Sequence, residues 1–321
     1  DLRLSRGLGD VYKRQQSNPT YLVETNINNF VLRRKPPGKL LKSAHAVDRE
    51  CRVMTALHDT DVPVPKTFGY CDDETVIGTP FFVMDHVVGN IYWELLLPGC
   101  DPNQRREIYL SMNDTIARLH NVDFNKVNLA DYGKHENYMG RQIHRWTKQY
   151  KDSETQMIPE INELIEWLPK NIPSDQETSI VHGDFRLDNM IFDPITHEVK
   201  AILDWELSTL GNPIADFTYH MMSWRLPAGA KGLGMMGSDL KSLNIPSESE
   251  YAELYYKKTG REKIDNWDFY MAYNIFRLAG IAQGIVGRVR DGTASSSEAK
   301  NYEAFVPILG KLGWSIVEGI K

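Results

Sequence analysis

The sequence predicts an α+β protein, with a small antiparallel β part that carries one helix and a larger, mainly helical part after it. Runs rich in β-branched and aromatic residues predict strands at Thr20–Glu24 and Asn29–Arg34, and further strands within Val62–Cys71 and Pro80–Gly89. From Asn103 onward, apolar residues instead recur at helical spacing. With 321 residues, the chain is long enough to form two such lobes.

The first 15 residues are not expected to belong to the native protein. The run Ser5–Gln15, SRGLGDVYKRQ, resembles the translation of a sequencing-library adapter, so we treat residues 1–15 as a non-native addition. We then expect the small β-rich lobe to extend over residues 16–87, without its first strand. The helical lobe is expected to extend over residues 88–321.

The composition narrows the class of partner. The net charge of −6 argues against nucleic acid as the main partner, because phosphate binding usually requires a basic excess. No segment approaches the ~18 consecutive apolar residues of a membrane span. The 3 cysteines are widely spaced and odd in number, which favours free thiols in a reducing cytoplasm. We therefore expect a cytoplasmic protein whose main partner is neither nucleic acid nor a membrane.

A helix expected from about Ala44 to His58 carries a carboxylate on its apolar face. Val47, Met54 and Leu57 recur at helical spacing on one side of this helix. Glu50 falls on the same side. Because a buried carboxylate is costly unless it is paired, we expect a cation from another segment to meet Glu50.

The helical part contains four segments with clear apolar periodicity and one irregular stretch. The helices are expected at Asn103–His120, Gly140–Tyr150, Ile158–Leu168 and Trp267–Val289. The stretch from Leu226 to Ser249 is rich in Gly, Ser and Pro, and we expect a loop there.

Polar residues gather in the central stretch VHGDFRLDNMIFD, residues 181–193. Asn189 immediately precedes a strand-like run, and Asp204 ends the strand-like run that returns after a turn. If the two runs form an antiparallel hairpin, both side chains lie at its open end, about 5 Å apart. Two oxygen ligands at this spacing suit Mg²⁺. Asp184, on the loop that enters the hairpin, can face the same space without binding the cation, which is where a base or a group that positions a nucleophile belongs.

The alternative is that Asp184, Asp188 and Asn189 only form turn hydrogen bonds, as Asp and Asn commonly do. Taken singly, each residue fits that interpretation. The combination of a His-x-Asp loop, an Asn five residues later, a hairpin and a terminal Asp favours a catalytic site instead.

These residues resemble those of a known family. HGDFRLDN, followed by ILDWE at 202–206, resembles the catalytic and metal-binding segments of the aminoglycoside phosphotransferase/choline kinase family, which has a bilobal protein-kinase-like fold. The resemblance covers Gln16 to Lys321 and is closest to the kinase-like domains that occur fused to acyl-CoA dehydrogenases. LADYGKHENYMGRQIHRW and GNPIADFTYH resemble that subgroup as well.

The resemblance implies a role for each residue of the central site. Asp184 would accept or orient the substrate proton, and Asn189 and Asp204 would be the Mg²⁺ ligands. His182 would brace the loop, because phosphoryl transfer depends mainly on positioning and charge neutralisation. Arg186 would approach phosphate or substrate, with an exposed surface position as the alternative.

In the small lobe, the resemblance implies a basic residue that holds phosphates and pairs with a helix glutamate. Arg33 would take this place opposite Glu50, where protein kinases use lysine; Arg34 and Lys35 are weaker options. Two groups would complete the nucleotide site: phosphate contacts from Ser17 and Asn18, and an inter-lobe hinge at Met84, Asp85, His86 and Val87.

The leading hypothesis is an ATP- and Mg²⁺-dependent phosphotransferase that acts on a small-molecule hydroxyl, with GTP as the alternative nucleotide. The acceptor suggested by the subgroup is a hydroxyacyl-CoA-type metabolite, and by analogy the chain is fused to or associated with acyl-CoA dehydrogenase-type enzymes. Alternatives are an aminoglycoside or amino-alcohol kinase, and a pseudokinase that binds nucleotide without turnover. A protein kinase is disfavoured because no D-F-G or A-P-E segment is present. A metal-dependent hydrolase would need more His and carboxylate ligands.

Overall fold

A computed structural model describes residues 3–6, 18–36, 46–174, 177–229, 232–292 and 301–320. The chain divides into two compact units. The first comprises Asp1–Tyr132, His182–Thr209 and Leu243–Ile245, and the second comprises Gly133–Val181, Leu210–Ser242 and Pro246–Lys321. The first unit therefore holds both the β-rich segment and the central polar stretch. The boundary expected between residues 87 and 88 follows composition along the chain and stays a prediction.

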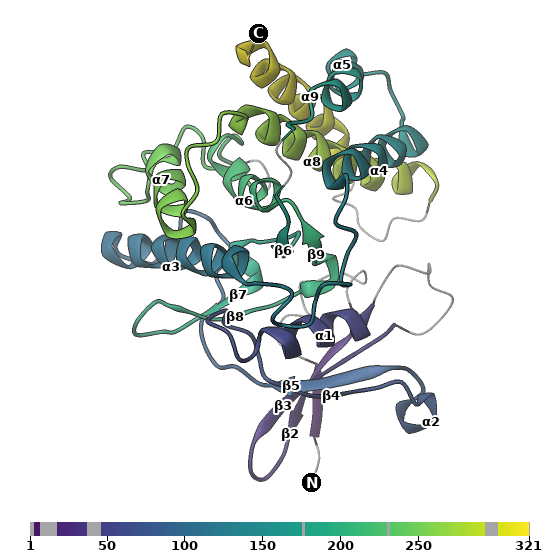
Figure 1. The fold of residues 1–321 in the computed structure, drawn as a ribbon, viewed down its shortest axis with the longest axis vertical. Coiled ribbons are helices and arrows are strands. Elements are labelled where there is room, and N and C mark those ends of the chain that lie inside the picture. Colours follow the sequence, from purple (N-terminus) through teal and green to yellow (C-terminus); the bar gives the residue numbers. More distant parts are fainter. Residues whose placement is uncertain are drawn as a thin grey trace. The chain divides into compact units, whose positions relative to one another are not determined.

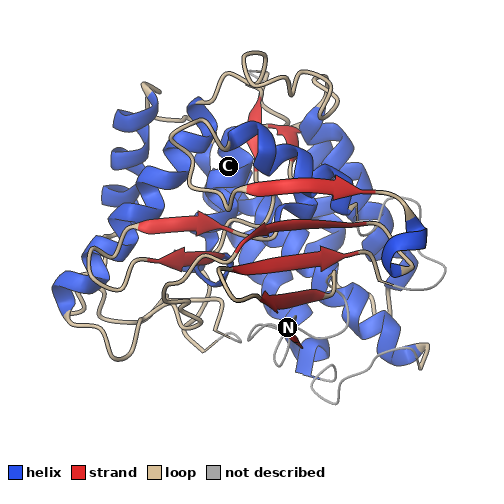
Figure 2. Cartoon of the chain, turned by 90° about the horizontal axis from the view of Figure 1, so that it is seen from below, coloured by secondary structure: helices blue, strands red, loops and turns tan. Residues whose placement is uncertain are grey.

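A five-stranded sheet forms the first part of the first unit (Figure 1 and Figure 2). Its strands, in spatial order, are β1 (Arg3–Arg6), β2 (Thr20–Glu24), β3 (Asn29–Arg34), β5 (Phe81–Asp85) and β4 (Thr67–Cys71). All neighbouring strands are antiparallel. The strands expected at residues 20–24 and 29–34 are confirmed.

We expected the small lobe to lack its first strand, but residues Arg3–Arg6 form the edge strand β1. Leu4 and Ser5 pair with Val23 and Leu22 of β2. Any segment that adopts an extended conformation can pair in this way, because the hydrogen bonds between strands are formed by main-chain groups. The pairing therefore leaves the origin of residues 1–15 a prediction.

Helix α1 (Val47–Leu57) packs on strands β4 and β5 of this sheet. Its apolar face is buried, as the periodicity of the sequence predicts, and Met54 and Leu57 are almost inaccessible. Glu50 lies on the same face and is 1% exposed. Between β4 and β5 the chain forms only the short helix α2 (Glu74–Ile77).

The first unit also contains α3 (Pro102–Asn121) and the hairpin of β7 (Met190–Phe192) and β8 (Val199–Ile202). Helix α3 begins with a capping box, in which the Asp101 side chain accepts from backbone N–H groups and the Gln104 side chain accepts from the Asp101 N–H. The hairpin is antiparallel, as expected, and α3 packs against β8.

The second unit is mainly helical (Figure 1). Its helices are α4 (Tyr138–Ser153), α5 (Pro159–Trp167), the 3₁₀ turn η1 (Leu168–Lys170), α6 (Pro213–Met221), the 3₁₀ turn η4 (Met222–Trp224), α7 (Glu248–Thr259), α8 (Trp267–Arg290) and α9 (Asn301–Ile320). A two-stranded sheet of β6 (Ser179–Val181) and β9 (Thr209–Gly211) accompanies them.

The centre of the second unit is α8, which packs against α4, α6 and α9. Helix α8 is apolar on most of its circumference, and its buried residues include Tyr273, Phe276 and Ala279. A helix of this kind forms the core of a bundle rather than its surface. In the described part of the chain, no helix combines the length and apolar character needed to cross a membrane.

Candidate active site

The central stretch forms a tight loop between His182 and the hairpin. Gly183 has a φ of +82°, and a Cβ atom at this position would lie 2.7 Å from the Leu207 carbonyl oxygen. Both the backbone angle and the close approach require glycine here. The loop continues through a 3₁₀ turn, η2 (Leu187–Asn189), directly into β7. The turn therefore places Asn189 at the open end of the hairpin.

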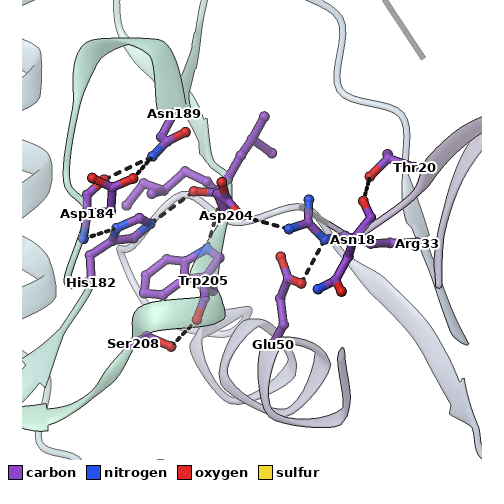
Figure 3. Close-up of polar contacts among 12 residues, drawn as sticks. Asn18, Thr20, Arg33, Glu50, His182, Asp184, Asn189, Asp204, Trp205 and Ser208 are labelled. Carbon is purple, nitrogen blue, oxygen red and sulfur yellow. Dashed lines mark hydrogen bonds and ion pairs between the residues drawn. The ribbon is translucent and has the colours of Figure 1, made fainter. Parts of the chain in front are cut away.

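Asn189 is joined to Asp184 across this loop. The Asn189 amide nitrogen donates to the Asp184 backbone oxygen at 3.0 Å and to its Oδ2 atom at 3.1 Å. These two hydrogen bonds fix the orientation of the amide, so that its oxygen points away from Asp184 (Figure 3). Asn189 is 2% exposed, and its position is therefore set by the interior of the unit.

His182 connects the loop to the end of β8. Its Nε2 atom lies 2.9 Å from the Leu203 carbonyl oxygen, and its Nδ1 atom accepts the Asp184 backbone N–H at 3.2 Å. Together these contacts require the neutral tautomer with the proton on Nε2. The ring is fully buried and lies 4.8 Å from the Trp205 ring. The ring therefore links the loop to the end of β8, and its role as a brace stays a prediction.

Asp204 follows β8 at the same end of the hairpin. The backbone N–H of the preceding residue, Leu203, donates to the Asn189 carbonyl oxygen at 2.8 Å, which brings Asn189 and Asp204 together. Asp204 has a φ of 67° and a ψ of 55°, in the left-handed region that is costly for residues other than glycine. The chain then turns into the 3₁₀ turn η3 (Trp205–Leu207).

Arg33 on β3 joins this site to helix α1 (Figure 3). Its Nη2 atom lies 2.7 Å from Asp204 Oδ1, and its Nε atom lies 2.8 Å from Glu50 Oε2 in an ion pair that is not aligned as a hydrogen bond. The side chains of Arg33, Glu50 and Asp204 are 9%, 2% and 12% exposed. The cation that the buried Glu50 required is therefore Arg33, and one guanidinium contacts two carboxylates.

Burial and the neighbouring charges shift the pKa values of Arg33 and Glu50 in opposite directions. Burial alone would lower the pKa of the Arg33 guanidinium, but the Glu50 and Asp204 carboxylates raise it overall. Burial raises the pKa of Glu50, while the Arg33 charge acts in the opposite direction. The ion pair with Arg33 thus partly offsets the effect of burial on Glu50.

Glu206 is a residue of this site that sequence reasoning missed. Burial and the nearby Asp204 carboxylate raise the pKa of Glu206 to about 7. The Arg33 charge lowers the pKa of Glu206 by a smaller amount, and the Glu50 and Asp184 carboxylates raise it further. The only signal in the sequence was a second acid two residues after Asp204 in ILDWE.

The remaining expected nucleotide contacts are only partly described. Asn18 is buried, and its carbonyl oxygen accepts from the Thr20 hydroxyl at 3.0 Å, next to the point where Thr20 pairs with Arg33. Ser17 lies outside the described residues. Arg186 forms a bidentate ion pair with Asp188, at 3.1 and 3.2 Å, on the same loop.

The expected hinge lies at the end of β5. Met84 is buried within the strand and Asp85 closes it, with the Asp85 N–H donating to the Lys66 carbonyl oxygen at 2.8 Å. His86 and Val87 follow and are half-buried. The contact of these four residues with an adenine base stays a prediction.

The donor set at the hairpin end fits Mg²⁺. The Asn189 amide oxygen and the Asp204 carboxylate are hard oxygen donors, and Mg²⁺ commonly takes one or two protein ligands of this kind with phosphate and water. Among the described residues, no group of three or more His, Cys, Asp or Glu side chains is arranged to hold a metal ion. The arrangement thus suits a cation shared with phosphate better than a metal site made by protein alone.

Known proteins resemble this chain in sequence. The model of the phosphotransferase enzyme family matches residues 11–253. Mouse acyl-CoA dehydrogenase family member 10 is 46% identical over 300 residues, which are 93% of this chain and 28% of that protein. Human acyl-CoA dehydrogenase family member 11 is 41% identical over 304 residues, which are 94% of this chain and 39% of that protein. The chain therefore spans well under half the length of these relatives.

Solved structures show the same fold. A proposed aminoglycoside phosphotransferase from Ralstonia eutropha superposes with a TM-score of 0.91 at 46% identity, covering 99% of this chain and 93% of that one. Choline kinase from Streptococcus pneumoniae superposes with a TM-score of 0.57 at 13% identity, covering 97% and 93% of the two chains. The α+β, bilobal, kinase-like fold predicted from the sequence is confirmed.

Proposed function

Because the chain belongs to the phosphotransferase enzyme family, we propose that it transfers the γ-phosphate of ATP to a hydroxyl group of a small molecule. GTP is the alternative donor. The observation that carries the proposal is the convergence, within one unit, of Asp184, Asn189, Asp204 and the Arg33–Glu50 pair. Phosphoryl transfer needs positioning and charge neutralisation more than covalent chemistry, and these side chains supply both.

Each residue has a task that its position allows. The Asp184 carboxylate is held by Asn189 at 3.1 Å, where it would accept or orient the proton of the attacking hydroxyl. Arg33 would contact donor phosphates through its guanidinium fork, while Glu50 keeps its stem in place. His182 fixes the Asp184 backbone, which keeps the carboxylate at one angle.

Asn189 and Asp204 would hold Mg²⁺ through their side-chain oxygens. When bound, this ion neutralises phosphate charge and links the nucleotide to the protein. In the present structure Asp204 is paired with Arg33. We therefore expect the nucleotide and the cation to bind together, because phosphate gives Arg33 another anionic partner.

The acceptor that we propose is a hydroxyacyl-CoA-type thioester. The support is the identity of 46% and 41% to two proteins named as acyl-CoA dehydrogenase family members, of which this chain matches only one segment. A kinase segment joined to an acyl-CoA enzyme is expected to act on a related metabolite. Fusion or association with such an enzyme belongs to the same proposal.

The test is transfer of γ-³²P from ATP to hydroxyacyl-CoAs, amino alcohols and aminoglycosides, with and without Mg²⁺. We expect labelled hydroxyacyl-CoA, and we expect Asp204→Ala and Asp184→Asn to remove transfer while the fold remains intact by circular dichroism. Asp152→Ala is the matched control, because Asp152 is an exposed carboxylate of α4 paired only with Lys148 among the contacts of the described residues.

Three results would each contradict a part of the proposal. Near-native turnover in Asp204→Ala would remove the assignment of Asp204 as an Mg²⁺ ligand. ATP binding that ignores Mg²⁺, with no transfer to any acceptor, would instead indicate a nucleotide-binding module without turnover. Transfer only to amino alcohols or aminoglycosides would retain the kinase and overturn the acceptor.

A further inference from the structure

One motif of the sequence, LADY at residues 129–132, has no task in the proposed reaction. It follows α3 and lies in the first unit with the hairpin and α1. Leu129 and Tyr132 are both 0% exposed. A tyrosine that is completely buried needs a partner for its hydroxyl group, so the contacts of Tyr132 indicate what this motif holds.

The Tyr132 hydroxyl reaches the turn that follows Asp204. It lies 2.6 Å from Ser208 Oγ, and the Ser208 hydroxyl donates to the Trp205 carbonyl oxygen at 2.5 Å. The Ser208 backbone N–H donates to the same carbonyl at 3.0 Å. Tyr132 therefore orients the serine that closes η3 and thereby holds the residue immediately after Asp204.

The same tyrosine is fixed to helix α1. Its hydroxyl lies 3.2 Å from the Arg49 carbonyl oxygen, and the Arg49 guanidinium stacks over its ring at 4.1 Å from the centroid. The Arg49 Nη2 atom also donates to the Tyr132 carbonyl oxygen at 2.7 Å. Arg52, one turn later, forms an ion pair with Asp131. Two arginines of α1 thus hold the LADY segment in place.

Helix α1 is consequently joined to the η3 turn by two routes. One route is Glu50, which contacts Arg33, and Arg33 in turn contacts Asp204. The other route runs from Arg49 through Tyr132 and Ser208 to the Trp205 carbonyl oxygen. The Asp204 carboxylate and the Trp205 carbonyl oxygen are therefore both held from α1, the first through Arg33 and the second through Tyr132 and Ser208.

This second route matters because Asp204 has left-handed backbone angles. A non-glycine residue keeps such angles only where its surroundings impose them. The hydrogen bonds of Trp205 are adjacent to that strained residue. If the Trp205 carbonyl lost its hydrogen bonds to Ser208, Asp204 could adopt more common backbone angles. Its carboxylate would then point in a different direction.

We propose that Tyr132 is a positioning residue for the cation site, acting through Ser208 on the backbone of the Asp204–Trp205 turn. The proposal rests on the assignment of Asp204 as an Mg²⁺ ligand in the proposed function. Burial raises the pKa of Tyr132 to about 12, so its hydroxyl stays protonated at neutral pH and remains a donor. The LADY segment would then contribute to activity, although it lies far from the hairpin in the sequence.

The experiment measures cation affinity directly in the full chain. Mn²⁺ replaces Mg²⁺ as a paramagnetic probe, and its dissociation constant in the presence of ADP is determined by electron paramagnetic resonance. We expect Tyr132→Phe to weaken Mn²⁺ binding about tenfold, the lower end of the range for groups that orient metal ligands. Ser208→Ala should give a similar loss. The double variant should lose no more than either single variant, because both interrupt one route.

The matched control is Tyr109→Phe. Tyr109 is buried in α3, and its hydroxyl donates to the Leu95 carbonyl oxygen at 2.7 Å, so this change also removes one buried hydrogen bond. We expect Tyr109→Phe to lower the unfolding midpoint as Tyr132→Phe does, but to leave Mn²⁺ affinity unchanged. Equal Mn²⁺ affinity in wild type and Tyr132→Phe would overturn the inference, as would an equal loss in Tyr109→Phe. Absence of Mn²⁺·ADP binding in the wild type would instead overturn the proposed function.

Discussion

At the scale of single residues, the use of arginine rather than lysine at position 33 has a structural reason. The guanidinium is planar and presents donors on several edges, so Arg33 contacts Glu50 through Nε and Asp204 through Nη2. A lysine ammonium is a compact charge at the end of a flexible stem and would have to share one position between the two carboxylates. The arginine therefore links strand β3, helix α1 and the η3 turn at once.

The Arg33 cluster leads to a prediction about stability. We expect Arg33→Met to lower the free energy of unfolding by about 3–5 kcal/mol, because it leaves the Glu50 charge buried without its partner. Adding Glu50→Gln should restore part of this loss, since the second change removes that charge. Urea denaturation monitored by tryptophan fluorescence provides the measurement.

Arg52→Met serves as the matched control for this prediction. Arg52 lies on the same helix, but its ion pair with Asp131 is exposed, with side chains 43% and 76% accessible. We expect a loss below about 1 kcal/mol. Equal losses for Arg33→Met and Arg52→Met would show that burial does not set the strength of the Arg33 pair.

The pairing of Arg33 with Glu50 could be predicted from the sequence, but the other contacts of this cluster could not. Glu50 was identifiable because helical periodicity places it on an apolar face, and its pairing with Arg33 was expected from the resemblance. The contact between Arg33 and Asp204 was not expected, since 171 residues separate the two side chains. Tyr132 and Ser208 were missed for the same reason: a buried hydroxyl pair has no local spacing that reveals it.

At the scale of elements, the exit from the sheet is joined to the hairpin by a close backbone contact. Asn90 and Phe192 form an antiparallel bridge, with N–H to carbonyl distances of 2.8 Å in both directions. Gly89 permits this approach, because a Cβ atom there would lie 2.4 Å from the Phe192 carbonyl oxygen. The chain that leaves β5 is thus held against β7, the strand that begins directly after Asn189.

We predict that Gly89→Ala destabilises the protein by about 1–3 kcal/mol, because the added methyl group forces the bridge apart. Weaker ADP binding should accompany this loss, since the expected hinge immediately precedes the bridge. The measurements are urea denaturation and calorimetric titration of ADP with Mg²⁺. Gly319→Ala is the control: its added methyl group would meet no atom within 4 Å, and stability should not fall. An unchanged Gly89→Ala protein would show that the bridge is not maintained in solution.

The elements themselves were largely predictable, and the exceptions have local causes. The helices expected near residues 103–120, 140–150 and 267–289 are present because long amphipathic or apolar periods specify them. The strand expected within Val62–Cys71 is shorter and begins only at Thr67. Pro63 and Pro65 lack an N–H group and interrupt the ladder before that point.

At the scale of the whole molecule, composition and spatial grouping divide the chain differently. Composition changes near residue 88, where strands give way to helices. Spatial grouping instead places α3, the loop at residues 182–189 and the hairpin with the sheet. Sequence patterns report local structure and cannot show which distant segments pack together, so this grouping was not predictable.

The grouping leads to a prediction for ligand binding. Every described residue that we assign to the nucleotide and the cation lies in the first unit, from Asn18 and Arg33 to Asn189 and Asp204. Binding should therefore slow local opening mainly in that unit, because a ligand stabilises the segments that contact it. We expect ADP with Mg²⁺ to increase protection from hydrogen exchange in α1, in the 84–90 segment and in η3. The core of the second unit, such as α9, should change little.

Hydrogen–deuterium exchange followed by mass spectrometry provides this measurement, with ADP plus EDTA as the control. EDTA should remove protection in η3 in particular, since Asp204 and the turn after it are the segment that the cation would hold. Protection of η3 that persists in EDTA would mean that the nucleotide alone orders the turn, and Asp204 would then not be a cation ligand. Equal protection of α9 and η3 would mean that the nucleotide stabilises both units alike, against the assignment of its contacts to the first unit.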